Sequence, residues 1–323
     1  MPGILLVDPV PAPLAERLRL LFPPAAPINM VASYSEEQLI RYALETEILL
    51  VIHRKVDAHL LSLLPRVRFI QRVGVGYDNL DLGALQAAGI VAAYTPGANA
   101  VPVAEHTILL MLALLKRFVA AESAARQGNW PTAELIQAGL GDLANATVGL
   151  VGFGNIGRAV AQRLAPFGTQ LVYTARHAVD PAIEQQFGAR YVSLDDLLAS
   201  SKFVSLHLPL TATSRGLIGE AELAKMQQGA FLINTSRGEI LDEMALHRAL
   251  VSGKLGGAAL DVLSSDPPAS NPFADMPQVI VTPHIAGASR AGVERGVQMA
   301  IANVARFMRG ESLLDLIPMP SAS

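Results

Sequence analysis

A glycine-rich segment, set between an apolar run and an amphipathic stretch, limits the fold of this chain more than any other feature. Residues 147–158 read TVGLVGFGNIGR, and an alanine-rich amphipathic pattern continues to about Phe167. This order predicts a buried strand, a tight turn and a helix. Gly152 permits the turn, Gly154 lets the backbone approach a pyrophosphate, and Gly157 lets the helix pack closely on the strand. The helix N-terminus offers free N–H groups to phosphates, so the segment predicts a dinucleotide site. The alternative is a tight turn that binds nothing.

Length and composition set the broad class. The chain has 323 residues, of which 51% are apolar and 16% charged, which predicts two well-packed globular domains. A net charge of −3 gives no reason to expect nucleic acid or an anionic membrane as a partner.

Cysteine content and hydropathy indicate in which cellular compartment the protein resides. There are no cysteines, which excludes disulfides, thiolate nucleophiles and cysteine-ligated metals and fits a reducing cytoplasm. Residues 2–8 lack the basic start and cleavage site of a signal peptide. The longest apolar run, 108–115, is far shorter than the ~18–20 residues that cross a bilayer. We therefore expect a soluble, cytoplasmic protein.

Strand and helix patterns alternate along the chain. The first hundred residues predict strands at 4–8, 48–53, 68–73 and 90–93, with helices at 14–22, 36–45 and 82–88. A turn-rich break at 95–99 predicts a hinge, and an apolar helix follows at 102–119. The second series predicts strands near 148–151, 170–174, 203–207, 230–234, 257–260 and 279–282, with helices near 155–167, 181–187 and 243–252. Such alternation indicates parallel sheets covered on both faces, in the doubly wound manner of nucleotide folds.

The chain closes with a helical pattern from about Arg290 to Met308, which Gly310 ends. The first domain has no other helix of this size. We therefore expect the end of the chain to fold back onto the first domain.

The residues that follow the second strand of the nucleotide series bear on the cofactor. An acid that binds the adenine ribose hydroxyls should lie ~20 residues after the glycines. Ala175 occupies that position, and Arg176 and His177 follow it. A carboxylate there would repel a 2′-phosphate, whereas a guanidinium binds one. The pattern favours NADP(H) over NAD(H). In the alternative, Arg176 is a solvated surface arginine and NAD is held by other contacts.

Three polar residues follow predicted strands, where open α/β sheets place their ligands. Arg237 lies in Asn-Thr-Ser-Arg-Gly, Asp266 lies a few residues after the strand at 257–260, and His284 ends Thr-Pro-His. Singly they are explained as a helix-entry arginine, a turn acid and a loop histidine. Together they offer a cation, a carboxylate and an imidazole, which proton-coupled hydride transfer requires.

Several motifs carry a specific resemblance. They are 73–79 (VGVGYDN), 95–97 (TPG) with 103–106 (VAEH), the glycine fingerprint, 206–211 (LHLPLT), 234–238 (NTSRG), 259–262 (ALDV) and 282–284 (TPH). In these motifs and their order the chain resembles the D-isomer-specific 2-hydroxyacid dehydrogenase family, which includes glyoxylate/hydroxypyruvate reductases and phosphoglycerate dehydrogenases.

The resemblance implies an α/β fold of two Rossmann-like or flavodoxin-like lobes with parallel sheets and an active site in the interdomain cleft. The substrate-binding domain would comprise 1–98 plus 287–323, and the dinucleotide-binding domain 99–286. It also implies a homodimer built largely on the nucleotide lobe.

The resemblance also implies roles for individual residues. Arg237 matches the substrate-binding arginine and His284 the general acid/base. Asp266 stands where the family usually has glutamate, so its shorter side chain would reach His284 less easily, although any carboxylate favours a protonated imidazole. The expected cofactor-binding residues are Gly152, Gly154, Asn155, Ile156, Gly157, Thr174, Ala175, Arg176, Leu208, Pro209, Thr213, Thr235, Ser236 and Asp261, the last at the nicotinamide amide.

A mechanism follows from these roles. The carboxylate of a small 2-oxo acid would bind the backbone N–H groups of Gly74, Val75 and Gly76, with Arg237 on its carboxylate and carbonyl oxygens. Hydride from the reduced nicotinamide would reach the carbonyl carbon while His284 donates a proton to the oxygen.

Other functions and weaker signals stay open. A phosphoglycerate dehydrogenase is one alternative, weakened because the chain ends soon after the closing helix, without a regulatory domain. A non-catalytic dinucleotide-sensing corepressor is another.

Trp130 either packs in a core or interface or lines a neighbour's pocket, and the basic turn at 53–55 either faces the cleft or is solvated. Glu105 and His106 do not share a helix face, so we expect no metal site.

Overall fold

The computed structural model describes residues 2–22, 27–265, 268 and 270–319. The chain divides into two compact units: unit 1 comprises 1–99 with 290–323, and unit 2 comprises 100–289. The domain boundaries expected from the sequence differ from these by one residue at the first boundary and three at the second. No helix among the described residues is long and apolar enough to cross a membrane.

Unit 1 is built on a five-stranded, all-parallel sheet in the order β2-β1-β3-β4-β5. Its strands are β1 (Gly3–Leu6), β2 (Ile28–Met30), β3 (Thr46–Val51), β4 (Phe69–Arg72) and β5 (Val91–Ala93). Its helices are α1 (Ala12–Leu21), α2 (Glu36–Ile40), α3 (Ala58–Leu63), α4 (Leu82–Ala87) and α13 (Arg290–Met308). This strand order is the flavodoxin-like form of the doubly wound fold.

Both faces of this sheet are covered. Ile4 and Leu6 pack into one apolar cluster, while Leu5 and Val7 pack into the cluster on the other face. Successive strand residues point to opposite faces, so a run without polar residues fits a strand buried on both sides.

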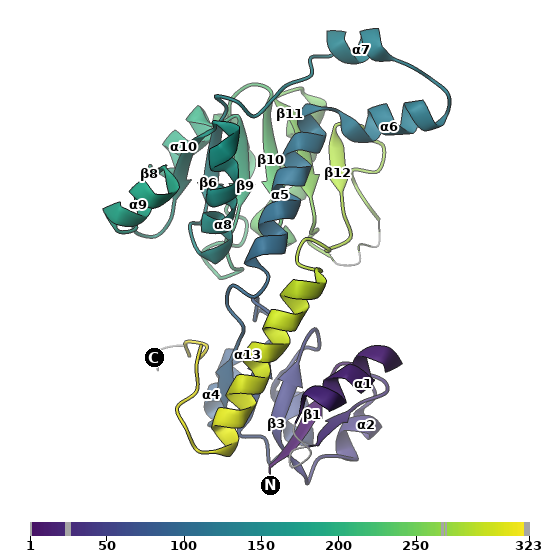
Figure 1. The fold of residues 1–323 in the computed structure, drawn as a ribbon, viewed down its shortest axis with the longest axis vertical. Coiled ribbons are helices and arrows are strands. Elements are labelled where there is room, and N and C mark those ends of the chain that lie inside the picture. The colour runs from purple at the N-terminus through teal and green to yellow at the C-terminus, as the bar shows by residue number, and fades with distance from the viewer. Residues whose placement is uncertain (1, 23–26, 266–267, 269, 320–323) are drawn as a thin grey trace. The chain divides into compact units, whose positions relative to one another are not determined.

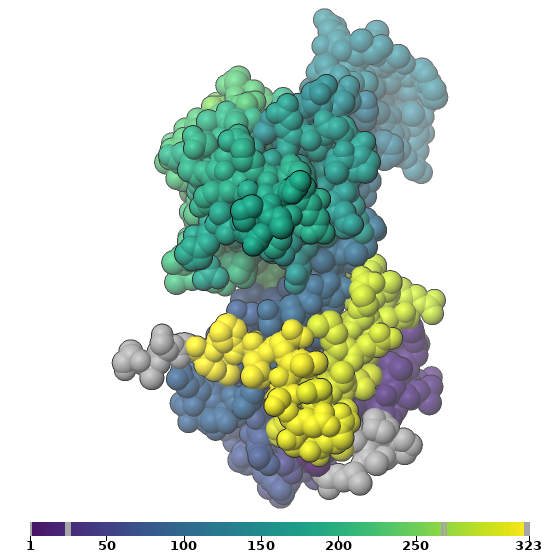
Figure 2. Space-filling view, turned by 60° about the vertical axis from the view of Figure 1, so that its left-hand side comes forward, coloured from purple at the N-terminus to yellow at the C-terminus, as the bar shows by residue number. Residues whose placement is uncertain are grey.

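Helix α13 completes unit 1. The Asn303 side chain donates to Gln71 Oε1 on β4 (3.0 Å) and to the Leu314 carbonyl (2.9 Å), and its own oxygen accepts from Leu314 N–H (2.9 Å). Phe307 stacks on Phe69 at a centroid distance of 5.2 Å. Figure 2 shows this C-terminal segment, in yellow, lying over the purple and blue residues of unit 1.

Unit 2 is built on a seven-stranded, all-parallel sheet in the order β12-β11-β10-β9-β6-β7-β8. The strands are β6 (Thr147–Val151), β7 (Gln170–Thr174), β8 (Ala189–Tyr191), β9 (Phe203–Leu206), β10 (Ala230–Asn234), β11 (Leu255–Leu260) and β12 (Val279–Val281). The order reverses between β6 and β9, as at the switch point of a dinucleotide-binding sheet. The predicted α/β class with parallel sheets is confirmed for both units.

The helices of unit 2 are α5 (Ala100–Leu115), α6 (Phe118–Arg126), α7 (Thr132–Gln137), α8 (Asn155–Leu164), α9 (Pro181–Phe187), α10 (Leu194–Ser200), α11 (Glu220–Lys225) and α12 (Glu243–Val251), with 3₁₀ turns at Ala165–Phe167 and Gly238–Ile240. Helices α5 and α8 pack side by side on one face of the sheet (Figure 1).

The helix expected at 102–119 ends earlier than predicted. Arg117 adopts a left-handed conformation (φ 46°), which separates α5 from α6. Residues 118–140, here called the arm, carry α6 and α7, whose residues are nowhere buried. In Figure 1 the arm extends away from the sheet of unit 2.

Candidate active site

The glycine turn joins β6 to α8. Gly152 has a φ of +101°, and a Cβ there would overlap the carbonyl oxygen of His207. A Cβ at Gly157 would overlap the carbonyl oxygen of Gly152, so α8 lies against the turn. A Cβ at Gly154, in contrast, would meet nothing within 4 Å. Gly154 therefore faces open space beside the first turn of α8, which has no side-chain cap and leaves its N–H groups available to an anion.

The other expected residues of unit 2 follow strands of the same sheet. Because all strands are parallel, their carboxyl ends form one edge. This edge carries the following groups: Thr174 to Arg176 at β7, Gly152 at β6, His207 to Pro209 at β9, Thr235 to Arg237 at β10, Asp261 at β11 and Thr282 to His284 at β12. Thr213 lies in the turn region that follows β9. Asp266 lies outside the described residues.

Arg237 is held in a tight loop after β10. The Asn234 side chain donates to the Arg237 carbonyl (2.9 Å), and its oxygen accepts from Ser236 N–H (3.0 Å) and Ser236 Oγ (2.7 Å). The guanidinium of half-buried Arg237 donates to the Ser236 carbonyl (2.8 Å). A Cβ at Gly238 would overlap the backbone of Leu263, so the loop passes very close to the segment after β11.

His284 is exposed and lies in a turn of unusual geometry. Its φ is +54°, in the left-handed region that residues other than glycine seldom adopt. Its N–H donates to the Asp261 carbonyl (2.9 Å) and to the Thr282 carbonyl (3.0 Å).

The carboxylate of Asp261 holds this turn. Oδ1 accepts from Thr282 Oγ1 (2.6 Å) and Ile285 N–H (2.9 Å), and Oδ2 accepts from Ala286 N–H (2.8 Å). Asp261 is only 1% exposed. The sequence predicted Asp261 as a cofactor contact but gave no sign of this structural role, because the partner residues lie more than twenty positions away.

Unit 1 contains the turn expected to bind the substrate carboxylate. This turn, at Gly74, Val75 and Gly76, follows β4. The Arg72 side chain lies over Gly74, where a Cβ would overlap its guanidinium. Arg72 donates to the Val73 carbonyl (2.6 Å) and to Asn79 Oδ1 (3.3 Å). Glycine at position 74 therefore makes room for a cation beside the turn.

A buried carboxylate whose role was not predicted from the sequence lies after β1. Asp8 is 1% exposed and accepts hydrogen bonds from Ile52 N–H (2.6 Å), His53 N–H (2.8 Å) and Arg54 N–H (2.8 Å). It thereby fixes the basic turn that follows β3. Arg54 also donates to the Tyr34 carbonyl (2.9 Å) and lies over the Tyr34 ring.

The residues after β7 and β9 bear on the cofactor. Ala175 is half-buried, and Arg176 is exposed and forms no ion pair with any described residue.

Burial lowers the pKa of His207 from 6.5 to about 3, so the imidazole is neutral near pH 7. Its Nε2 lies 2.9 Å from Ser205 Oγ, and its buried Nδ1 has no partner among the described residues.

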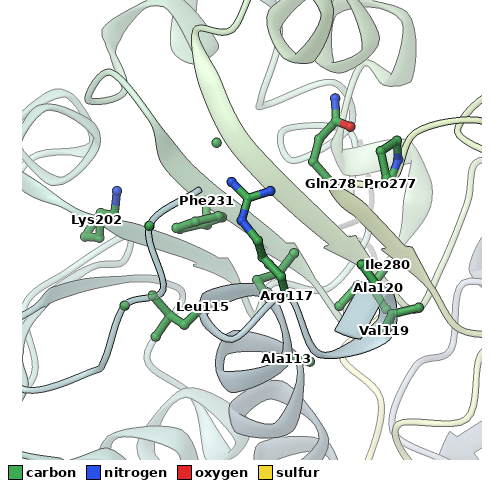
Figure 3. Close-up of a pocket in the computed structure, with 14 residues that line it drawn as sticks. Ala113, Leu115, Arg117, Val119, Ala120, Lys202, Phe231, Pro277, Gln278 and Ile280 are labelled. Atoms are coloured by element: carbon green, nitrogen blue, oxygen red, sulfur yellow. The ribbon is translucent and has the colours of Figure 1, made fainter. Parts of the chain in front are cut away.

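A cavity of about 180 Å³ lies elsewhere in unit 2 (Figure 3). It is lined by Lys202, Phe231, Gly256 and Gln278, which lie just before or within the first two residues of strands, and by Arg117 between α5 and α6. It therefore lies at the amino-terminal edge of the sheet, opposite the glycine turn, and it is not the expected cofactor site.

Comparison with known proteins decides the family. The family model described as "D-isomer specific 2-hydroxyacid dehydrogenase, NAD binding domain" matches residues 108–286. The chain belongs to this family. It is thus an NAD(P)-dependent oxidoreductase, and unit 2 contains the residues that match the family's NAD-binding domain.

Individual relatives extend the match to most of the chain. A glyoxylate reductase of Thermococcus litoralis is 38% identical over 268 residues, which cover 81% of this chain and 80% of that protein. A D-3-phosphoglycerate dehydrogenase of Mycobacterium tuberculosis is 34% identical over 291 residues, and the match covers 90% of this chain but only 54% of that protein. Among solved structures, a glyoxylate reductase from Paecilomyes thermophila has a TM-score of 0.86 at 31% identity, covering 98% of each chain.

Proposed function

We propose that this dehydrogenase reduces a small 2-oxo acid of the glyoxylate or hydroxypyruvate type and prefers NADPH. The observation that carries the proposal is the common sheet edge of unit 2. There a phosphate-accepting glycine turn, a guanidinium and an imidazole follow β6, β10 and β12. The relatives named glyoxylate reductase support the substrate class.

The chemistry of this edge fits reduction of a ketone. The reduced nicotinamide supplies the hydride when it is bound. Arg237 would hold the carboxylate and carbonyl oxygens of the substrate through charge-assisted hydrogen bonds. His284 would donate a proton to the carbonyl oxygen as negative charge develops on it. Unit 1 would contribute the N–H groups of the turn at 74–76 to the substrate carboxylate.

The cofactor site we propose comprises the fourteen positions named from the sequence, beginning with the glycine turn. The NADP preference rests on Ala175 in place of an acid, followed by exposed Arg176. A guanidinium that is not already paired is available to a 2′-phosphate. Asp266 is proposed as the carboxylate partner of His284.

We further propose a homodimer in which the arm contacts a second copy of the chain. Five large apolar side chains of the arm are exposed: Phe118, Val119, Trp130, Ile136 and Leu140, of which Trp130 is 81% exposed. Several exposed large apolar side chains on one segment are typical of an interface with another chain.

A cofactor oxidation assay tests the function. Absorbance at 340 nm is followed with NADPH and with NADH, each against glyoxylate, hydroxypyruvate, pyruvate and 3-phosphohydroxypyruvate. We expect the highest kcat/KM with NADPH and one of the first two acids. Preference for 3-phosphohydroxypyruvate with NADH would instead identify a phosphoglycerate dehydrogenase. Tight cofactor binding without any turnover would support a dinucleotide-sensing corepressor.

A further inference from the structure

We propose that His106 on α5 is a positioning residue that holds the turn bearing His284. This inference rests on the proposed function, because His284 matters as a proton donor only if the chain reduces a ketone. His106 is not expected to touch substrate or cofactor. It would act through Thr282 and Asp261.

The contacts of His106 join α5 to the turn after β12. His106 Nε2 lies 3.1 Å from Thr282 Oγ1 and 3.6 Å from Asp261 Oδ1. The His106 side chain is 12% exposed. This contact links positions 176 apart in the sequence, so the sequence alone gave no reason to connect them.

The direction of these hydrogen bonds follows from the groups available. Thr282 Oγ1 donates to Asp261 Oδ1 (2.6 Å), so the Thr282 hydroxyl hydrogen points to Asp261. The hydroxyl has no second hydrogen. Hence Nε2 of His106 carries the hydrogen that completes the chain His106 → Thr282 → Asp261.

This chain fixes the carboxylate that shapes the turn. Asp261 uses Oδ1 for Ile285 N–H and Oδ2 for Ala286 N–H, the two residues that follow His284. These bonds hold the backbone while His284 stays at a φ of +54°. If the His106 donor is lost, only its bond to Asp261 still holds the Thr282 hydroxyl, so the bracing of Asp261 weakens and the left-handed conformation of His284 loses support.

The residue that follows His106 shows that α5 is tied to the loops of this sheet edge at a second point. Thr107 Oγ1 donates to the Val103 carbonyl (2.8 Å), so in its contact with Thr235 (3.2 Å) the Thr235 hydroxyl is the donor. Thr235 belongs to the loop that carries Arg237. Consecutive helical residues point about 100° apart, which lets one helix reach loops on either side of β11.

The test compares three variants. His106→Leu removes the donor, and His106→Gln keeps an N–H group at the position of Nε2. The control, His247→Leu, makes the same chemical change at a half-buried histidine on α12, which packs against Phe273. We expect His106→Leu to lower kcat for 2-oxo acid reduction about 10- to 100-fold, with the Kd of the reduced cofactor within about twofold of wild type. His106→Gln should recover kcat to within about threefold, and His247→Leu should match wild type.

A second readout does not depend on turnover. The chain has seven histidines, so their ring C–H signals can be resolved by NMR, with the His284 signal assigned by its loss in His284→Asn. The signal should move in His106→Leu and stay in place in His106→Gln. The inference is overturned if His106→Leu leaves kcat and the His284 signal unchanged, or if His106→Gln is as slow as His106→Leu. A wild-type protein that reduces no 2-oxo acid overturns the proposed function, and the inference with it.

Discussion

Arg176 is the residue on which the choice between the two nicotinamide cofactors depends in this account. It is exposed and directly follows half-buried Ala175, which occupies the position after β7 where many dinucleotide sites carry an acid. We expect Arg176→Ala to lower kcat/KM for NADPH about 10- to 100-fold and to leave NADH use almost unchanged, because a charge-assisted hydrogen bond to the 2′-phosphate is lost. Steady-state kinetics with both cofactors measure this ratio.

Arg190→Ala serves as the control for Arg176. Arg190 is also an exposed arginine, on the neighbouring strand β8. If both variants change the NADPH to NADH ratio equally, or neither changes it, Arg176 does not select the cofactor.

His207 predicts a pH dependence of stability. Its pKa is about 3 in the folded chain and 6.5 when exposed, so the unfolded state binds the extra proton between these values. The free energy of unfolding therefore falls as pH drops from 6.5 toward 3, by at most about 1.4 kcal/mol per pH unit from this group. In His207→Asn this contribution should vanish, and urea unfolding at pH 7 and pH 4.5 measures the difference. An equal loss of stability in both proteins would show that His207 takes up no proton on unfolding.

At the scale of single residues, the sequence predicted positions better than contacts. The need for glycine could be predicted at these positions because it depends on local backbone geometry: a Cβ would overlap a backbone oxygen at Gly152 and Gly157 and would meet nothing within 4 Å at Gly154. The bracing of Asp261 by Thr282 and His106 could not be foreseen. It depends on tertiary contacts between a helix and two loops far apart in the chain.

At the scale of elements, most strands were predictable from their apolar runs, including the three-residue strands β5 and β12, whereas β2 and β8 were not. The strands predicted at 4–8 and 148–151 contain runs without polar residues at 4–7 and 148–151, and both strands are present as β1 and β6. Strands β2 (INM) and β8 (ARY) have three residues each and include a polar residue, so they show no apolar run, and most of their residues are not fully buried. Helix α13 was predicted with its observed bounds because its pattern is long and Gly310 ends it.

The return of α13 to unit 1 predicts a stability effect at Asn303. Asn303→Leu leaves buried Gln71 and the Leu314 backbone without their partners, which should cost roughly 1–3 kcal/mol. Gln298→Leu, at an exposed position on the same helix, is the matched control and should be near neutral. Urea unfolding of the two variants gives the comparison. Equal midpoints would mean that the Asn303 bonds contribute nothing to the stability of unit 1.

At the scale of the whole molecule, the arm predicts the oligomeric state. We expect light scattering to give twice the chain mass of 34.2 kDa for wild type. Trp130→Lys combined with Ile136→Lys should shift the protein to monomer, because two exposed apolar side chains of the arm would become charged. Leu20→Lys, an exposed position in unit 1, should leave the dimer intact. A monomeric wild-type protein would contradict the dimer proposal.

The sequence also predicted the two-part organisation, because two alternating series of strands and helices are separated by a turn-rich break. The family's motifs then pointed to the chemistry of each part. What the sequence left open is the identity of the 2-oxo acid, since the side chains that contact its far end come together only through tertiary folding.

In the function proposed for this chain, His284 would donate the proton that the ketone oxygen of the substrate receives. The most direct test measures kcat with a saturating 2-oxo acid and the Kd of the reduced cofactor, for wild type and His284→Ala in parallel. We predict that kcat falls by roughly 10²- to 10⁴-fold while the Kd stays within about twofold, because only proton transfer is lost. Turnover by His284→Ala at the wild-type rate would contradict the account.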